Sequence, residues 1–372
     1  MALGYLDDSK LYAIASAIRA KTGDSATMSV DDMPDEIGSI STGAQVEPLS
    51  VTENGTYSAP TGYAYTPVTV NVSGGGGITA DDVARRAISG SVGGSAAFVA
   101  EYAFAKCLQL TAASFPNATY VDGWAFSGCT SLAEITFDKA TSIGSSAFYF
   151  CVNLKSASFP SCTSIGQAAF LSCTKLSAFD APICSFVGQS AFSYCLSLGA
   201  VSMPNCSSVG AAAFANCQSL SVAYLPSCKS IGGNAFSVCT KLKEATVTNA
   251  TYIGNYAFAS CRSLASINLP SAKTIGSYAF IRCTELSYVN APIVSTISLQ
   301  AFSSCYHLLE LRLDNVPSVP LLRSSVFTAT PIGGYTASTG GVYGSVYVPS
   351  SLYSAFLTAS MWSSISARIV SV

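Results

Sequence analysis

Hydrophobic positions recur along this chain with a constant period. An Ala-Phe pair followed three residues later by Cys occurs ten times, each time 22 residues after the last. The phenylalanines of this series are Phe104, Phe126, Phe148, Phe170, Phe192, Phe214, Phe236, Phe258, Phe280 and Phe302. A constant period of this size predicts a solenoid, in which each unit packs only on its neighbours. Such repetition favours recognition or scaffolding over catalysis, because it builds an extended surface.

Each unit of this series predicts one short strand followed by turns. A Leu present in all ten units starts an alternation of apolar residues, which is the pattern of a half-buried strand. Pro ends this segment in seven units. An Ile or Val then turns the chain back into the core, a Gly permits the bend beside it, and the Ala-Phe segment returns on the convex side. We therefore expect a repeat solenoid of ten units with a parallel β-sheet on its concave face, capped at both ends.

The regions outside the repeats have different patterns. Two short amphipathic helices are predicted at the N-terminus, and the run Glu53-Asn54-Gly55-Thr56 predicts the turn of a β-hairpin. Near the C-terminus the period fails, and a strand from Ser345 and a helix from Ser350 are expected. The predicted segments are an N-terminal helical anchor (1–45), a small β module (46–73), a Gly-rich linker and N-terminal cap (74–98), the solenoid (99–319) and a C-terminal cap (320–372).

Composition excludes several classes of function. Charged residues make up 10% of the chain, and the formal net charge is −2, against about 25% charged residues in average proteins. Because the sequence has no Lys/Arg run, neither nucleic acid nor an anionic membrane is an expected partner. No apolar run approaches the about 20 residues of a membrane-spanning helix. The N-terminus has no basic region before an apolar core, so no secretion signal is expected.

Fourteen cysteines are predicted to be free, buried thiols. Ten lie in the Ala-Phe-x-x-Cys column, and the other four form a second column at Cys162, Cys184, Cys206 and Cys228. Residues of one column point the same way from stacked coils, which suits core packing and not the demanding geometry of a disulfide. The constant spacing and the single His also argue against a metal site. We expect no metal and no cofactor.

No catalytic residue is predicted when the units are compared with one another. His307 lies near Cys305 and could suggest a Cys-His nucleophile, but the equivalent Cys recurs nine times without any His. The Gly-rich stretches lack a phosphate-binding lysine. The chain is therefore not expected to be an enzyme.

A better candidate is the exposed face of the predicted strands. The residues two and four positions after each Leu are small in the N-terminal half, where they could pack against another copy of the chain. They become richer in Tyr, Asn, Glu and Arg in the C-terminal half, a composition that can stack on sugars or anchor a protein. The candidate binding residues are Tyr224, Glu244, Asn268, Tyr288, Asn290, Glu310 and Arg312.

The repeat unit resembles the BspA-type bacterial leucine-rich repeat, for example in residues 264–285. The C-terminal pattern of Val346-Tyr347-Val348-Pro349, Trp362 and Arg368-Ile369 resembles that family's cap. The resemblance implies a right-handed leucine-rich repeat solenoid. It also implies that the four cysteines of the second column serve the backbone of a loop, as Asn or Cys does at this place in leucine-rich repeats.

The N-terminus resembles a different group of proteins. Residues 11–23 and 33–37 are similar to leader segments of tail and fibre proteins from phages of Gram-positive hosts, and residues 51–72 resemble a small β module of the same proteins. This resemblance implies that residues 1–72 bind other virion proteins, that the repeats face outward, and that the chain forms a homo-oligomer, with a trimer favoured. The leading hypothesis is thus a phage tail-fibre or baseplate protein, located on the virion, whose repeats bind a host surface glycan or protein. The alternatives are a bacterial cell-surface adhesin and a capsid decoration protein.

Overall fold

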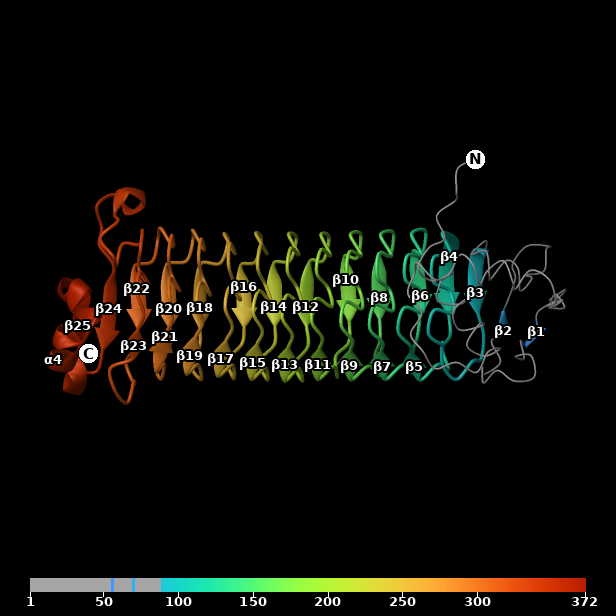
Figure 1. Ribbon diagram of the computed structural model, residues 1–372, viewed down its shortest axis with the longest axis horizontal. Helices are drawn as coiled ribbons and strands as arrows, with labels where there is room; N and C mark the ends of the chain where they lie inside the picture. Colours follow the sequence, from blue (N-terminus) through green and yellow to red (C-terminus); the bar gives the residue numbers. More distant parts are fainter. Residues whose placement is uncertain (1–54, 57–68, 71–87) are drawn as a thin grey trace, which may run out of the picture.

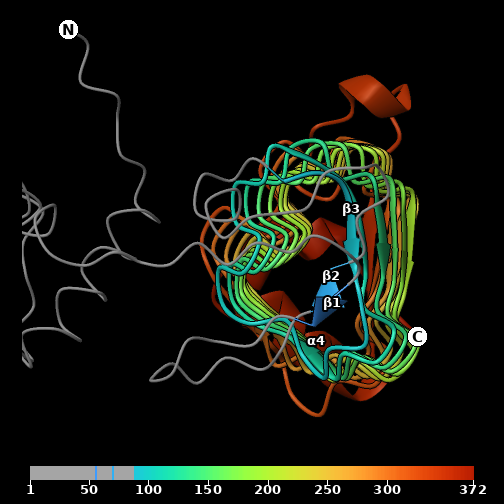
Figure 2. The same ribbon diagram turned by 90° about the vertical axis from the view of Figure 1, so that its right-hand side faces the viewer.

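The computed structural model describes residues 55–56, 69–70 and 88–372, and residues 88–372 form one continuous solenoid (Figure 1). Its coils stack in a nearly straight row, and the view along that row shows successive coils lying over one another (Figure 2). The predicted repeat solenoid is confirmed. The helical hairpin expected within residues 1–45 lies outside the described residues.

One side of the solenoid carries a first row of strands. The row has thirteen strands in residues 88–372, ten from the sequence repeats and three from the ends. Between regular units each hydrogen-bonded pair is parallel and joins residues 22 apart, as Val222 is joined to Glu244. The strands are β3 (Ser89–Gly93), β4 (Gln109–Ser114), β6 (Glu134–Thr136), β8 (Ser156–Ser158), β10 (Ala178–Asp180), β12 (Ala200–Ser202), β14 (Val222–Tyr224), β16 (Glu244–Thr246), β18 (Ser266–Asn268), β20 (Tyr288–Asn290), β22 (Glu310–Arg312), β24 (Ser345–Val348) and β25 (Ile369–Ser371).

The hydrogen-bond ladder of the first row is interrupted at three places. The breaks lie between β6 and β8, between β10 and β12, and between β16 and β18. They divide the row into sheets of three, two, three and five strands, and the five-stranded sheet β18-β20-β22-β24-β25 lies at the C-terminal end.

After a turn, each coil adds a two-residue strand to a second row. This row is one uninterrupted sheet of ten parallel strands. From the sequence, only a turn is expected at the Ile/Val column, because two residues are too few to show an alternating pattern. The strands are β5 (Tyr120–Val121), β7 (Ser142–Ile143), β9 (Ser164–Ile165), β11 (Phe186–Val187), β13 (Ser208–Val209), β15 (Ser230–Ile231), β17 (Tyr252–Ile253), β19 (Thr274–Ile275), β21 (Thr296–Ile297) and β23 (Leu321–Leu322).

The core is a set of parallel side-chain columns. The Leu and Cys columns of the ten repeats are fully buried. The ten repeat phenylalanines stack ring on ring along the axis, with centroids 5.1–5.4 Å apart between neighbouring coils. Each buried side chain of this size stabilises the folded chain by roughly 1.5–3 kcal/mol, but only when a neighbouring coil covers it.

Backbone hydrogen bonds of the Ala-Phe segments tie each coil to the next. The N–H of each repeat Phe from Phe104 to Phe280 donates to the carbonyl of the Ala one coil further on, as Phe104 does to Ala125 at 2.7 Å, and Phe302 donates to Val326 at 3.1 Å. The residues two before and two after each Phe donate in the same direction and have positive φ; where they are not Gly, φ lies between 50° and 62°. This left-handed conformation costs about 1–2 kcal/mol per non-Gly residue, and it aims alternate N–H groups at the next coil.

The conserved Gly after the Ile/Val column has a different role from the predicted bend. None of the series from Gly144 to Gly276 has a positive φ. A Cβ added at Gly210 would lie 2.6 Å from the backbone N of Gln189 and from the backbone C of Gly188. Gly is favoured from Gly144 to Gly276 because neighbouring coils approach too closely there for a Cβ unless the backbone shifts, and the column ends with Ser298.

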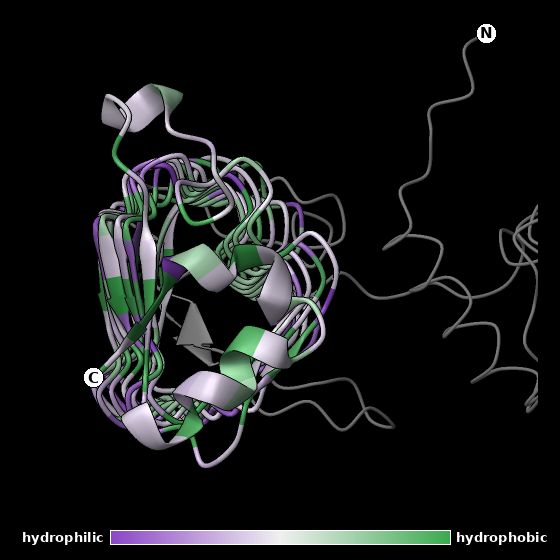
Figure 3. Ribbon diagram, turned by 90° about the vertical axis from the view of Figure 1, so that its left-hand side faces the viewer, coloured by the Kyte–Doolittle hydropathy of each residue, from purple (hydrophilic) through white to green (hydrophobic). Residues whose placement is uncertain are grey.

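The C-terminal cap closes the stack. Helices lie across the last coil in the view of that end (Figure 3). They are the 3-10 helix η3 (Ser350–Leu352), α4 (Tyr353–Thr358) and η4 (Trp362–Arg368). Trp362 is 1% exposed, its indole Nε1–H donates to the carbonyl of Pro320 at 2.8 Å, and its ring contacts Phe356. The predicted C-terminal helix is thus present as the two short pieces η3 and α4, and η4 follows it.

Two strands are described near the N-terminus. β1 (Gly55–Thr56) pairs antiparallel with β2 (Thr69–Val70). The prediction that Gly55 lies in a hairpin turn is wrong, because Gly55 is itself paired within a strand.

The close approach at the Gly column predicts a large effect of one methyl group. We expect Gly210→Ala to lower the free energy of unfolding by about 3 kcal/mol, since the neighbouring backbone must shift. The matched control is Gly199→Ala, where the nearest heavy atom to a new Cβ is 3.8 Å away, and this change should be neutral or slightly stabilising. Thermal unfolding followed by circular dichroism measures both, and equal effects would contradict the steric explanation.

The left-handed positions predict a stabilising substitution. Val238 has φ 62°, although a β-branched residue is poorly suited to it, and Asn216 holds the equivalent position one coil earlier with φ 61°. Val238→Asn should raise the free energy of unfolding by about 1 kcal/mol. The reverse change, Asn216→Val, should lower it by a similar amount. Urea unfolding of both variants tests the pair, and a loss of stability in Val238→Asn would show that packing of Val238 outweighs the backbone strain.

Candidate binding face

The seven candidate residues lie on the first row but on two different sheets. Tyr224 is on β14 and Glu244 on β16, both in the three-stranded sheet that includes β12. The other five lie on the five-stranded sheet, beyond the ladder break between β16 and β18. The structure therefore brings together Asn268, Tyr288, Asn290, Glu310 and Arg312.

Two aligned lines of side chains cross this five-stranded sheet. One line contains Ser266, Tyr288, Glu310 and Ser345, and the other contains Asn268, Asn290, Arg312 and Tyr347. We call the face that these eight residues cover the candidate binding face.

Asparagine side chains pair along the second line. The amide Nδ2 of Asn290 donates to Oδ1 of Asn268 at 2.8 Å. This bond orients both amides, and it leaves one further N–H of Asn290 and the NH2 group of Asn268 for a ligand.

Arg312 contacts three other side chains at this face. Its Nη1 lies 3.2 Å from Oε1 of Glu310, and its Nη2 lies 2.8 Å from Oδ2 of Asp314. The guanidinium also lies over the ring of Tyr347, 4.5 Å from its centroid, which is a cation–π contact. Hydrogen bonds to Asp314 and then to Glu310 raise the pKa of Arg312. The cation is therefore fixed in place, and its charge is already neutralised by two carboxylates.

Three aromatic residues near this face escaped the sequence prediction. Tyr347 follows Arg312 by 35 residues and not by 22, because the segment between β23 and β24 intervenes. That segment carries the 3-10 helix η2 (Ala337–Thr339) and projects beyond the outline of the coils (Figure 1). It exposes Tyr335 and Tyr343, and Arg368 lies 3.6 Å from the centroid of the Tyr343 ring. The alternation in Val346-Tyr347-Val348 could have revealed Tyr347. If this strand is aligned as one more coil after β22, Tyr347 falls beside Arg312.

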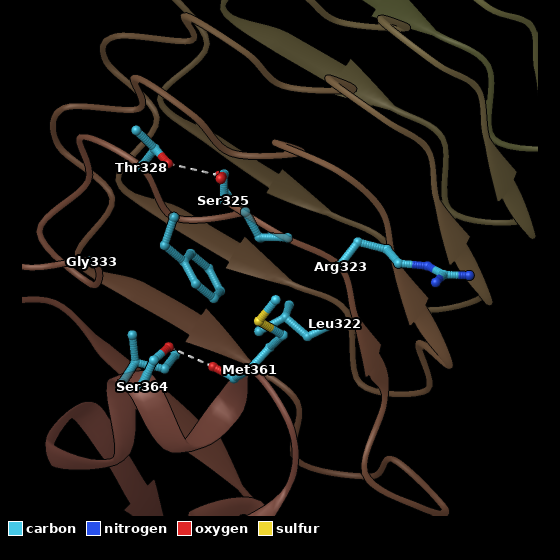
Figure 4. Close-up of a pocket in the computed structure, with 10 residues that line it drawn as sticks. Leu322, Arg323, Ser325, Thr328, Gly333, Met361 and Ser364 are labelled. Carbon is cyan, nitrogen blue, oxygen red and sulfur yellow. Dashed lines mark hydrogen bonds between the residues drawn. The ribbon is translucent and has the colours of Figure 1, made fainter.

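A cavity of about 280 Å³ lies elsewhere, between β23 and η4. Its lining is largely apolar, with Leu322, Val326 and Met361 among its walls, and Arg323 extends away from it (Figure 4). The hydroxyls of Thr328 and Ser364 are bonded to nearby carbonyls. With no converging polar groups, the cavity is a packing gap beneath the cap and does not suit catalysis.

The Cys305 and His307 side chains do not form a nucleophile pair. The Sγ of Cys305 donates to the carbonyl of Phe280 at 3.1 Å, and His307 Nδ1 bonds the carbonyl of Thr284 at 2.7 Å. Burial raises the pKa of the Cys305 thiol well above its usual value. Both side chains tie one coil to the previous one. In the part of the chain that the structure describes, no three His, Cys, Asp or Glu side chains gather as a metal would require.

All fourteen cysteines are buried thiols that form no disulfide, as predicted. From Cys129 onward, the thiols of the Ala-Phe-x-x-Cys column donate to the Phe carbonyl of the previous coil at 3.0–3.2 Å. Those of the second column donate to the carbonyl two residues on, as Cys184 does to Phe186 at 3.3 Å. Burial raises the pKa of Cys162 to about 12 and that of Cys184 to about 11. These thiols act as core residues that also satisfy backbone carbonyls.

Comparison with known families identifies the repeats. The profile described as BspA type leucine rich repeat region matches residues 98–221 and 185–309, which together exceed half of the chain. The chain belongs to the BspA type leucine-rich repeat family. This membership confirms the first of the two resemblances.

Solved structures of similar proteins come from several bacteria. A leucine-rich repeat protein of T. pallidum is 30% identical over 41% of this chain and 77% of its own length, with a TM-score of 0.39. A leucine rich cell surface protein of Faecalibacterium prausnitzii is 22% identical over 60% and 78%, with a TM-score of 0.33. The pneumococcal vaccine antigen PcpA is 14% identical over 86% and 98%, with a TM-score of 0.35. A comparison with curated proteins found no match. None of the three named structures supports the phage resemblance of residues 1–72.

Within the described residues, no helix combines the length and apolar character needed to cross a membrane.

The raised thiol pKa values predict how stability depends on pH. An unfolded thiol ionises near pH 9, whereas the folded thiols of Cys162 and Cys184 stay neutral to about pH 12 and 11. The unfolded chain therefore releases protons first, and the free energy of unfolding should fall as the pH rises from 9 toward 11. Urea unfolding across this range measures the slope.

A control variant separates the contribution of these thiols to the pH dependence from that of other groups that ionise above pH 9. Replacing Cys162 and Cys184 with Ala follows the residues already found at Ala118, Ala140, Ala250 and Ala272 of the same column. The stability of this variant should fall less steeply above pH 9 than that of the parent. An identical slope in both proteins would contradict the assignment.

Proposed function

We propose that this chain is a non-enzymatic recognition protein of the surface-adhesin kind, which binds a neutral glycan through the candidate binding face. Its place would be the bacterial cell surface. Family membership supports a binding scaffold, because the repeats build one continuous surface. The observation that carries the proposal is the line Asn268, Asn290, Arg312 and Tyr347, in which the two Asn side chains are hydrogen-bonded to each other and Arg312 lies over the Tyr347 ring.

Pre-organisation is the first reason to assign binding to this face. The paired amides and the clamped guanidinium lose little side-chain freedom when a ligand arrives, which lowers the cost of association. In the N-terminal half of the row, the equivalent positions hold residues such as Ser156, Ser158, Ala200 and Ser202. Those small side chains offer neither stacking surface nor amide groups.

Charge selects the class of ligand. Glu310, Arg312 and Asp314 together carry a formal charge of −1, and both ion pairs occupy the guanidinium. An anionic ligand would meet no free cation here. Amide N–H groups, a carboxylate and tyrosine rings instead suit the hydroxyls and apolar ring faces of a neutral sugar.

The phage tail-fibre hypothesis rests on residues 1–72, which lie largely outside the described residues. Its partners, its virion location and its trimer receive no support from the comparisons. The capsid decoration hypothesis likewise has none. The adhesin alternative agrees better with the family and with the cell-surface relative of Faecalibacterium prausnitzii.

A glycan array tests the proposed ligand. The full chain should bind neutral glycans, and the double variant Tyr288→Ala, Asn290→Ala should lose at least about ten-fold in affinity because it removes a stacking ring and an amide. The control is Ser156→Ala, Ser158→Ala, the same positions on β8, which should bind like the parent. Equal binding by both variants, or capture of anionic glycans only, would contradict the proposal.

A further inference from the structure

The exposed face of the second row carries a regular pattern of large and small side chains. Facing solvent, every third strand presents a large apolar or aromatic residue: Tyr120 on β5, Phe186 on β11, Tyr252 on β17 and Leu321 on β23, which are 37%, 46%, 43% and 48% exposed. The strands between them present only Ser or Thr, and these are half-buried. The in-register strand pairing places all ten residues in one line. The candidate binding face has no part in this pattern.

The line forms evenly spaced projections and recesses. At ~4.8 Å between neighbouring strands, the large residues stand ~14 Å apart with two small residues in each gap. Because this sheet is uninterrupted and the stack is nearly straight, the spacing holds from β5 to β23 (Figure 1). A surface with the same period, shifted by one strand, would fit its projections into these recesses.

Polar groups beside the line are already satisfied within the chain. The hydroxyls of Thr141, Thr163, Ser185 and Ser207 each donate to the carbonyl 22 residues earlier, at 2.9–3.0 Å. If an interface buried these four hydroxyl groups, each would therefore keep its hydrogen-bond acceptor. Near β11, the fourth strand of the row, Ile183 is 44% exposed and lies three residues before Phe186, so two exposed apolar side chains are close in sequence there.

Charges flank the line asymmetrically. Asp122 and Asp138 lie at its N-terminal end, where Lys139 is hydrogen-bonded to Asn117 at 2.9 Å. The charged residues flanking its C-terminal half are Lys229, Lys273, Asp314 and Arg323, and Asp314 is paired with Arg312. An identical surface turned end for end would place acidic coils against basic coils.

We propose that a second copy of this chain packs antiparallel on the second-row face, with the large residues of each copy over the Ser and Thr residues of the other. The same patch serves both copies, as a two-fold interface requires. A strip of ten strands, ~45 Å long and ~10 Å wide, is smaller than the ~800 Å² per partner of a standard interface. The dimer should therefore be weak and dependent on concentration.

A glycan polymer is the other occupant of such a face, and the observations favour it less. The ring of Tyr120 is stacked on Phe98, with centroids 4.8 Å apart, so one of its faces is covered. A neutral polymer would also leave the opposed flanking charges without a role.

Sedimentation velocity of the full chain over a concentration series tests the proposal. We expect a monomer–dimer equilibrium whose dissociation constant rises at least about ten-fold in Phe186→Ser. Ser already occupies this line at Ser164 and Ser208, so the variant should fold, which thermal unfolding verifies. The control Tyr224→Ser removes an aromatic residue of similar exposure, 43%, from the first row and should dimerise like the parent.

The antiparallel orientation has its own test. With the one-strand shift that sets β19 over β7 of the partner copy, Lys273→Glu should weaken the dimer, and adding Asp138→Lys should restore it, because Lys273 precedes β19 and Asp138 precedes β7. A parent that stays monomeric at every concentration would overturn the proposal, and so would an oligomer that Phe186→Ser leaves unchanged. A monomeric parent whose glycan-array binding is lost in Phe186→Ser would assign the face to a glycan instead.

Discussion

The structure depends on hydrogen bonds between coils that are held in a fixed register. In the Ala-Phe segments, the Phe N–H groups from Phe104 to Phe280 each donate to the Ala carbonyl one coil further on. In the second row the direction is opposite, since Gly144 N–H donates to the Val121 carbonyl of the coil before. Both sets join the same pair of coils, so neither can shift without breaking the other. This fixed register aligns the Leu, Phe and Cys columns and covers each ring with the next.

The features that recur in every unit could be predicted from the sequence. Leu, Phe and Cys recur at one spacing, so their burial follows from stacking alone, and the alternation after each Leu located the strands of the first row. The features that sequence reasoning missed depend on how coils touch. The left-handed residues, such as Tyr194 and Val238, share no residue type, because the backbone contacts impose their conformation. The repeated Gly was visible, but its cause is a close approach between backbones that only the assembled stack reveals.

The candidate binding face was predictable only in part. Counting two and four positions from each Leu found five residues that the structure places on one sheet. It also found Tyr224 and Glu244, which lie beyond a break in the ladder that the sequence does not show. Tyr347 and Asp314 were missed because they lie outside the counted positions, although both contact Arg312. The repeat period therefore predicts which residues are exposed on the strands. It does not predict which of them contact one another when irregular segments intervene.

The constant 22-residue unit also limits how such a chain can change length. The two ends of any unit occupy equivalent points on successive coils, so a whole unit can be removed or duplicated without a new linker. Where the spacing changes, over the 25 residues from Ile297 to Leu322, the Gly column also ends, and Ser298 and Arg323 take its place. On the second-row face, where large residues occupy every third strand, only a change of three whole units, 66 residues, preserves the spacing. Tandem duplication can thus lengthen the first row in single steps, while the second row keeps its pattern only through triplets.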